Sequence, residues 1–297
     1  MRENMDKSFR LLEINERFAK GEAINKEKMI ADFNIPEKTF QRDISSLRQY
    51  YSEQGIGDLL YDRKSDCYRL KASPNKLSKE EVFAICKILI ESRAFNKVEF
   101  ESIITKLLHH CEIEEAKVVK CVISNERGNY IPLKHGKPII NSLWQLATAV
   151  IEQRIIEIEY KRLDDTTRFH EVKPVGIMFS EFYFYLIAYM ADDSKEYPTV
   201  FRVDRINKIE PTEQIFSVPY VEKFDESEFR KRVQFMFSGE LRRVRFIYRG
   251  VLEAVLDRLP TASVEKHIED GAIIRAEAYG NGIDMWLMSQ GDKVEIL

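Results

Sequence analysis

A short run of polar and basic side chains near the start of the chain has the chemistry to read DNA. Arginine and lysine can bind phosphate or guanine, and glutamine and serine can exchange hydrogen bonds with base edges. At helical spacing, five such residues share one face, and they are Lys38, Gln41, Arg42, Ser45 and Gln49. This face could enter a major groove, or it could be an ordinary solvated helix face. The pattern alone does not choose between the two.

Three helices are expected to position this face. The pattern predicts the first over residues 6–19, ended by Gly21, and the second over residues 26–33, capped by Asn25. A short turn then brings Pro36 to the first position of the third helix. Four apolar residues of the third helix lie within about 60° of one another and form its buried face, namely Phe40, Ile44, Leu47 and Tyr51. Two helices joined so closely are typical of a helix-turn-helix.

Two short strands are expected to follow the third helix. Residues 59–70 read as two short strands around a polar turn that carries Arg63 and Lys64 at its tip. The helices and this hairpin together predict a winged helix-turn-helix in residues 1–72, whose tip contacts the DNA backbone or the minor groove. The segment has 14 Lys and Arg residues against 13 Asp and Glu residues. Because its net charge is only +1, we expect a monomer to bind DNA weakly and the protein to act as a homodimer.

The chain as a whole shows no general attraction to phosphate. Its 297 residues contain 46 Lys and Arg against 49 Asp and Glu, which leaves a formal charge of −3. A protein that depends on phosphate contacts usually has a basic excess over a whole domain, so nucleic-acid binding here must be local. The four cysteines form no C-x-x-C pair, and no apolar run approaches the length of a membrane span. We therefore expect a cytoplasmic protein with reduced thiols and no membrane partner.

The third helix also resembles a known family. The segment 36–50, PEKTFQRDISSLRQY, is similar to the recognition helix of DeoR-type bacterial regulators, whose pattern is R-T-I-x-R-D-I-x-x-L. The matching residues are Thr39, Arg42, Asp43, Ile44 and Leu47. The resemblance adds Thr39 to the residues that are expected to contact DNA.

Breaker residues and changes of period divide the rest of the chain. The cluster Ser73-Pro74-Asn75 ends the first segment, and a helical pattern then begins with Ser78 and Glu81 at the spacing of a capping box. We expect a helical linker or dimerisation region over residues 73–138, whose last stretch, 125–138, is a loop. Residues 139–213 contain one helix and then alternating apolar and polar positions, which predicts a mostly antiparallel sheet domain.

The sheet domain resembles the WYL domain that often follows a winged helix. The matching segments are 173–176 (KPVG), 184–189 (FYLIAY) and 201–206 (FRVDRI), and the last is close to the family's F-R-x-D-R-I. Phe184 stands where the family's name-giving Trp would be. Because residues alternate along a strand, we expect Phe184 in the core and Tyr185 on the ligand face. The resemblance implies an Sm-like sheet that senses a nucleic-acid or nucleotide effector.

The same resemblance implies a pocket that contains Tyr185, Arg202 and Arg205. Tyrosine offers a stacking plane and a hydroxyl, and arginine can grip phosphate with two parallel hydrogen bonds. Residues three apart on a regular strand point to opposite faces, so the two arginines share a pocket only if the strand ends or bends near Asp204. Asp204 could instead simply pair with either arginine.

Five residues on the preceding strands could extend this anion site, and they are Tyr160, Lys161, Arg168, His170 and Lys173. Each has a purely structural alternative. Tyr160 could belong to the core. The basic residues around Asp164 and Asp165 could form a solvated hairpin rather than a ligand site.

Residues 214–297 alternate between strand and helix patterns and resemble the C-terminal extension that commonly follows WYL domains, most visibly over 286–297. The resemblance implies a role in oligomer contact or ligand closure. Within the segment 228–249, seven basic residues stand against two acidic ones, a local charge of +5. We expect this stretch to border the nucleic-acid ligand, and the alternative is that it is paired with acidic residues elsewhere. The complete chain is therefore expected to be a multidomain α+β protein.

No P-loop, G-x-G-x-x-G, H-E-x-x-H or G-x-S-x-G motif occurs in the sequence, so we expect no catalytic activity, cofactor or metal. The sequence predicts a bacterial transcriptional regulator, with repression as the expected effect. Its winged helix would bind double-stranded operator DNA, and its WYL domain would bind a nucleic-acid or nucleotide effector. The alternative is an accessory module in which the WYL domain regulates a partner nuclease or another enzyme.

Overall fold

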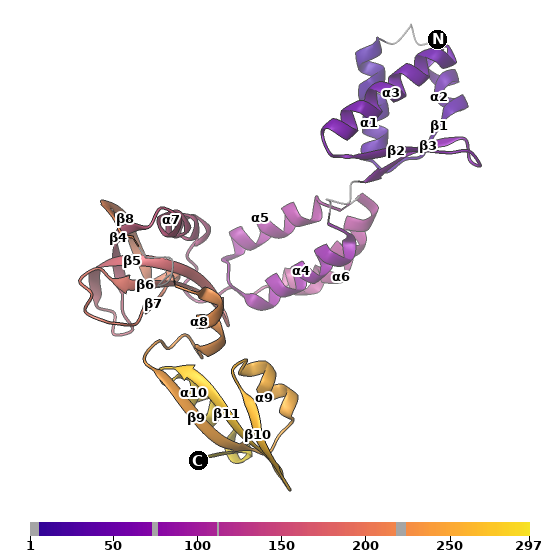
Figure 1. The fold of residues 1–297 in the computed structure, drawn as a ribbon. Helices are drawn as coiled ribbons and strands as arrows, with labels where there is room; N and C mark the ends of the chain where they lie inside the picture. The colour runs from indigo at the N-terminus through magenta and orange to yellow at the C-terminus, as the bar shows by residue number, and fades with distance from the viewer. Residues whose placement is uncertain (1–5, 73–76, 112, 218–223) are drawn as a thin grey trace. The chain divides into compact units, whose positions relative to one another are not determined.

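A computed structural model describes residues 6–72, 77–111, 113–217 and 224–297, and the ribbon in Figure 1 follows them. The fold mixes helices with three antiparallel sheets. Contacts divide the chain into two compact units, Met1–Glu91 with Lys97–Ile131 and Ser92–Asn96 with Pro132–Leu297. The four-part division expected from the sequence stays a prediction. The expected breaker cluster Ser73-Pro74-Asn75 lies outside the described residues.

The first part of the chain contains three helices and a small sheet. The elements are α1 (Lys7–Ala19), β1 (Ile24–Asn25), α2 (Lys26–Phe33), α3 (Glu37–Glu53), β2 (Gly57–Asp62) and β3 (Cys67–Ala72). The sheet order is β1-β3-β2. The three helices and the hairpin lie where the sequence pattern placed them, whereas the pairing of Ile24 with Tyr68 in β1 was not expected.

Local signals explain where these helices begin and end. The side chain of Asn25 accepts a hydrogen bond from the backbone N–H of Lys28, so it caps α2 as predicted. Asn34 closes α2 in the left-handed conformation, at a φ of 50°. Pro36 was predicted at the first position of α3 but occupies the N-cap, because its ψ of 146° is still extended and helical geometry starts at Glu37.

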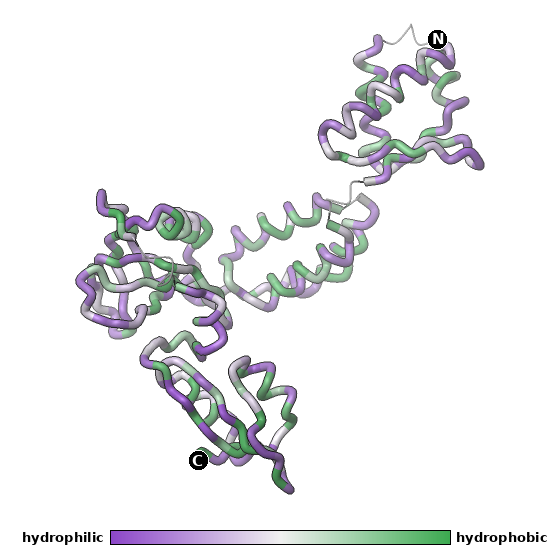
Figure 2. The backbone as a smooth tube through the Cα atoms, viewed as in Figure 1, coloured by the Kyte–Doolittle hydropathy of each residue, from purple (hydrophilic) through white to green (hydrophobic). Residues whose placement is uncertain are grey.

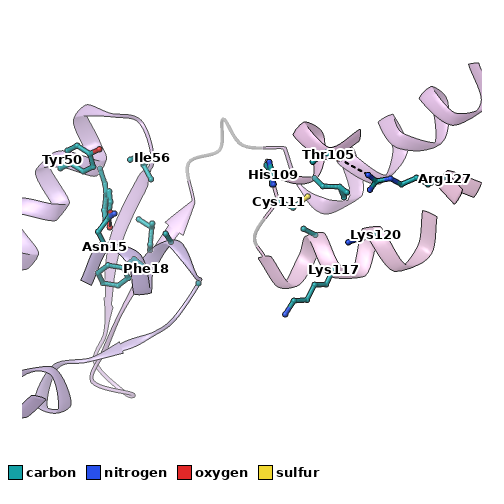
Figure 3. Close-up of a pocket in the computed structure, with 16 residues that line it drawn as sticks. Asn15, Phe18, Tyr50, Ile56, Thr105, His109, Cys111, Lys117, Lys120 and Arg127 are labelled. Atoms are coloured by element: carbon teal, nitrogen blue, oxygen red, sulfur yellow. Dashed lines mark hydrogen bonds between the residues drawn. The ribbon is translucent and has the colours of Figure 1, made fainter. Parts of the chain in front are cut away.

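The second part is a set of three helices, α4 (Lys79–Ser92), α5 (Lys97–Leu108) and α6 (Ile113–Gly128). The predicted capping box is present: the N–H of Ser78 donates to Glu81 at 2.7 Å, and the N–H of Glu81 donates to the Ser78 hydroxyl at 3.2 Å. Arg127 joins α6 to α5 through the Thr105 hydroxyl (Figure 3). The loop expected from residue 125 starts later, because α6 continues to Gly128.

The third part is a five-stranded antiparallel sheet with the order β7-β6-β5-β4-β8, as the change of period predicted. Its elements are α7 (Ile140–Ile151), β4 (Arg154–Lys161), β5 (Thr167–Ser180), β6 (Tyr183–Met190), β7 (Thr199–Arg202) and β8 (Ile206–Ile215). Leu146 and Ala149 of α7 pack on one face of the sheet, against Ile156, Leu186 and other apolar side chains. That burial fixes the helix on the sheet.

The last part is a four-stranded sheet with the order β10-β11-β9-β12. Its elements are α8 (Glu226–Arg232), β9 (Leu241–Tyr248), α9 (Leu252–Arg258), β10 (Ser263–Ile268), β11 (Gly271–Tyr279), α10 (Gly282–Ser289) and β12 (Val294–Ile296). Val255 of α9 and Trp286 of α10 share a core with Phe246 and Ile274, so both helices cover the same face of the sheet. Figure 2 shows the alternation of hydrophobic and hydrophilic residues along the backbone that produces such faces.

One further core contains residues from both sheets of the second unit. Phe229 and Val233 pack with Met178 and Ile187 of the five-stranded sheet, and Tyr279 of β11 borders the same cluster. The helix α8, which supplies Phe229, was not predicted. Among the described residues, no helix combines the length and the apolar character needed to cross a membrane.

Candidate functional site

The polar face of α3 is open to solvent. Its side chains at Lys38, Gln41, Arg42, Ser45 and Gln49 are all exposed, and Thr39 is half-buried. Two of the five already make contacts within the helix, because Gln41 donates to Glu37 at 2.9 Å and Gln49 donates to Glu53 at 2.8 Å. Such exposed contacts exchange easily for others, so the face can still offer donors and acceptors to a partner.

The opposite face of α3 holds the helix in place. As predicted, Phe40, Ile44, Leu47 and Tyr51 are buried, and they pack with α1 and α2 in one core. Asp43, which the sequence pattern matched without assigning a role, is 1% exposed and pairs with Arg10 of α1 at 2.5 Å. This ion pair orients the helix from inside the core. A pair of opposite charges 33 residues apart offers no periodic signal by which it could have been found.

The hairpin turn is exposed and structured by local hydrogen bonds. Arg63 and Lys64 lie in the turn between β2 and β3, as predicted, and both side chains are exposed. The Asp62 carboxylate accepts from the hydroxyl of Ser65 at 2.7 Å and from the N–H of Lys64 at 2.9 Å, and these bonds lower the pKa of Asp62. The tip therefore combines a hydrogen-bonded turn with exposed basic side chains.

The segment 201–206 forms a compact charged cluster at the edge of the five-stranded sheet. Strand β7 ends at Arg202, and a 3₁₀ turn over Val203–Arg205 follows, so the strand does end beside Asp204. Arg202 grips Asp204 with two hydrogen bonds, at 3.0 and 2.8 Å. The guanidinium of Arg202 also lies over the ring of Tyr183, 3.4 Å from its centre. Asp204 therefore pairs with Arg202, one of the two alternatives left open by the sequence.

Tyr185 and Arg205, the other two residues of the expected pocket, neighbour Arg202 in the sheet and in the 3₁₀ turn respectively. Tyr185 is opposite Arg202 in the sheet register, half-buried beside the Phe229 cluster, and burial raises the pKa of its hydroxyl. Arg205 is partly exposed, and the described residues offer it no ion pair. Tyr183, which sequence reasoning passed over, contributes the stacking plane beneath Arg202. Alternation along β6 was the available signal, since Tyr183 and Tyr185 share a face.

Three of the residues expected to extend the anion site, Tyr160, His170 and Lys173, have different surroundings. The hydroxyl of Tyr160 accepts from the N–H of Arg202 at 3.4 Å, while its ring packs edge-on against Phe201. His170 also lies near Phe201, and burial lowers its pKa. Lys173 pairs with Asp193 at 2.6 Å. Tyr160 thus touches the Arg202 cluster, whereas the lysine is engaged with a carboxylate.

The basic residues on the neighbouring hairpin pair locally. Lys161 lies 2.9 Å from Asp165, and Arg162 lies 3.9 Å from Asp164. All four side chains are largely exposed, which makes this turn the solvated hairpin that the sequence left open as an alternative.

The basic stretch 228–249 is extensively neutralised. Six of its seven basic side chains pair with carboxylates, namely Lys231, Arg232, Arg242, Arg243, Arg245 and Arg249. Glu228 pairs with both Lys231 and Arg232, and their hydrogen bonds lower its pKa to about 2. Arg230 instead donates to the backbone carbonyl of Phe179. The expectation that this stretch borders the nucleic-acid ligand is therefore not supported by its charge, because Glu228 and carboxylates distant in sequence balance it.

No group of three His, Cys, Asp or Glu side chains within the described ranges could hold a metal ion. The candidate sites thus consist of hydrogen-bonding, stacking and charged groups. These groups are suited to binding anions and bases.

Comparison with known proteins identifies the domain that contains the five-stranded sheet. The chain is similar to proteasome accessory factor B/C (PafBC) of Arthrobacter aurescens, with 17% identity and a TM-score of 0.32 over 100% of this chain and 46% of that one. It is also similar to a CRISPR Cas-related protein, with 13% identity and a TM-score of 0.39 over 83% of this chain and 71% of that one. The chain thus spans less than half the length of PafBC. No match was found among curated proteins. Residues 141–211 match the family model of the WYL domain, so the chain contains a WYL domain.

Proposed function

We propose that this protein is a DNA-binding transcriptional regulator. The observation that carries the proposal is the exposed polar face of α3, held by a buried face and by the Arg10–Asp43 pair. In this proposal, residues 1–72 act as a winged helix-turn-helix of the DeoR type. Helix α3 lies in the major groove, and Arg63 and Lys64 in the hairpin turn contact the backbone or the minor groove.

The WYL domain supplies the regulatory half of the proposal. A nucleic-acid or nucleotide effector binds beside Tyr183, Tyr185 and Arg202, where aromatic planes and a guanidinium lie together. Binding there shifts the population of the chain that is competent to bind DNA. Repression is the expected effect, and the working form is a homodimer on a palindromic operator, because a single recognition helix with little net charge gains from a second copy.

A mobility-shift assay with the DNA upstream of the protein's own gene tests the DNA-binding half. At a stated salt concentration, Arg42→Ala and Lys38→Ala should each weaken specific binding by about tenfold, which corresponds to the loss of one good base or phosphate contact. Lys20→Ala is the matched control, since Lys20 is an exposed lysine at the C-cap of α1 that pairs with Glu16. Unchanged promoter binding by both α3 variants would show that this helix does not read DNA.

A second candidate function is an accessory module in which the WYL domain regulates a partner nuclease or another enzyme. The exposed apolar side chains Ile140, Trp144 and Ile151 on α7 favour it, because they leave one side of the WYL domain with a surface suited to a protein partner. In that case the α3 variants would leave the activity of the complex unchanged, and Trp144→Ala would weaken the assembly. Sedimentation of the purified protein with and without its partner separates the two functions.

A further inference from the structure

A small cavity of about 150 Å³ lies where the five-stranded sheet meets α8 and α9. Its polar lining comes from four separate positions: Ser180 at the end of β5, Arg230 in α8, Gln234 in the loop after α8, and Arg258 at the end of α9. Apolar side chains, including Met178 and Val233, complete the wall. None of these residues belongs to the Arg202 cluster, so the cavity is a separate site.

One polar group in this cavity is buried without a partner. Among the described residues, the Nε–H of Arg258 is buried and makes no hydrogen bond. Gln234 lines the same cavity and is only 5% exposed. A buried donor without a partner is unfavourable, so this group points to a ligand that completes it.

The rest of the Arg258 side chain is held in place but only weakly neutralised. Its guanidinium lies 5.1 Å from the centre of the Phe235 ring, and its two terminal nitrogens are both 3.4 Å from one oxygen of Glu181. That carboxylate is largely exposed, and the contacts are long. A better acceptor can therefore replace Glu181 at little loss.

The loop that carries Gln234 adopts a specific, strained backbone conformation. Phe235 and Met236 both adopt the left-handed region, at φ values of 50° and 58°, which is unfavourable for residues other than glycine. The carbonyl oxygen of Gln234 sits against Gly282, where a Cβ atom would lie only 1.9 Å away. Because Gly282 has no side chain, the loop backbone can lie against it in the position that brings Gln234 to the cavity.

We propose that this cavity binds a phosphate group. Two guanidinium groups and a side-chain amide approach from three elements, which suits a tetrahedral oxyanion better than a planar carboxylate. A drug-sized ligand needs about 300 Å³ or more, so the cavity holds the phosphate and leaves any attached nucleoside outside. The phosphate can come from free inorganic phosphate, from a nucleotide or from the end of a single strand of nucleic acid.

Isothermal titration of the full chain in a phosphate-free and sulfate-free buffer tests the proposal. The probes are inorganic phosphate, deoxyadenosine 5′-monophosphate, and one short single-stranded DNA with and without a 5′-phosphate. Gln234→Glu places a carboxylate of the same size in the cavity, and Arg258→Gln removes a charge and the buried Nε–H. Each variant should weaken every phosphate probe that binds by about tenfold or more.

Arg243→Gln is the matched control, because Arg243 is an exposed arginine of the last sheet that pairs with Glu277. It should bind like the wild type. The tightest probe identifies the source of the phosphate, and a dependence on the 5′-phosphate of the DNA indicates a strand end. Thermal melting checks that each variant folds, and one folded variant of the two suffices. The proposal is overturned if no probe binds, or if no probe loses affinity in a folded variant. Either result leaves operator binding by α3 to be judged by its own assay.

Discussion

Arg10 and Asp43 form an ion pair inside the first core, 2.5 Å apart, with side chains that are 7% and 1% exposed. The pair joins α1 to α3 at the side of α3 that faces away from solvent. The attraction between two buried charges offsets the unfavourable free energy of their desolvation only when both charges are present. The Arg10–Asp43 pair therefore helps to fix the orientation of α3 on α1. That orientation in turn sets the direction in which the polar face of α3 points.

Removing one member of that pair should strongly destabilise the N-terminal part. Asp43→Asn removes the buried carboxylate that binds the Arg10 guanidinium, and we expect a loss of about 3–5 kcal/mol in the free energy of unfolding. Chemical denaturation of the full chain, followed by circular dichroism, measures the loss. The matched control is Glu13→Gln, which breaks the partly exposed pair with Arg17 and should change stability by less than about 1 kcal/mol. Equal stability of Asp43→Asn and wild type would refute a buried, charged pair.

The Arg202–Asp204 pair limits how strongly Arg202 can attract an anionic effector. Asp204→Asn removes the competing carboxylate, so we expect single-stranded DNA to bind a few-fold more tightly, whereas Arg202→Ala should weaken it about tenfold. Fluorescence anisotropy with a labelled oligonucleotide measures both. Arg162→Ala is the control, because it removes the same positive charge as Arg202→Ala but from the solvated hairpin. If all three variants bind like wild type, the effector does not contact this cluster.

His170 should make the stability of the WYL domain depend on pH. Burial, with Arg168 and Arg162 adding to it, lowers the pKa of His170 below its ordinary value of 6.5. The folded chain therefore binds this proton more weakly than the unfolded chain. Its contribution to stability is complete above pH 6.5 and is lost as the pH falls toward the lowered value in the folded chain.

The measurement is the denaturation midpoint at several pH values between 5 and 8, compared between wild type and His170→Gln. The midpoint of the wild type should fall relative to that of His170→Gln toward pH 5, because only the wild type has a histidine at this position to protonate. A constant difference across this range would mean that His170 has the same pKa in the folded and unfolded chain.

Most of the secondary structure could be predicted because its signals are local. The cap at Asn25, the box formed by Ser78 and Glu81, and the alternation along β6 all act over a few residues. The missed helix α8 shows the limit. It has seven residues and one buried apolar side chain, Phe229, which is too little to reveal a period.

The candidate sites were less predictable because long-range pairs decide them. Local composition gives the segment 228–249 a strong positive charge, but Arg249 meets Glu295, which is 46 residues away. Similarly, a motif match identified Arg202 and Asp204 as neighbours in sequence without showing that they bind each other. The stacking of Arg202 on Tyr183 depends on how β6 and β7 are paired. Only the fold supplies such partners.

Gly282 is expected to be indispensable for the loop that carries Gln234. In Gly282→Ala the new methyl group would lie 1.9 Å from the Gln234 carbonyl oxygen, a backbone atom that cannot simply rotate away. We expect a loss of about 1–3 kcal/mol in the free energy of unfolding, as for other overpacked sites. Gly128→Ala is the control, because a Cβ there meets nothing within 4 Å and alanine favours the end of α6. Thermal melting compares the two, and a Gly282→Ala protein as stable as Gly128→Ala would show that the loop can move aside.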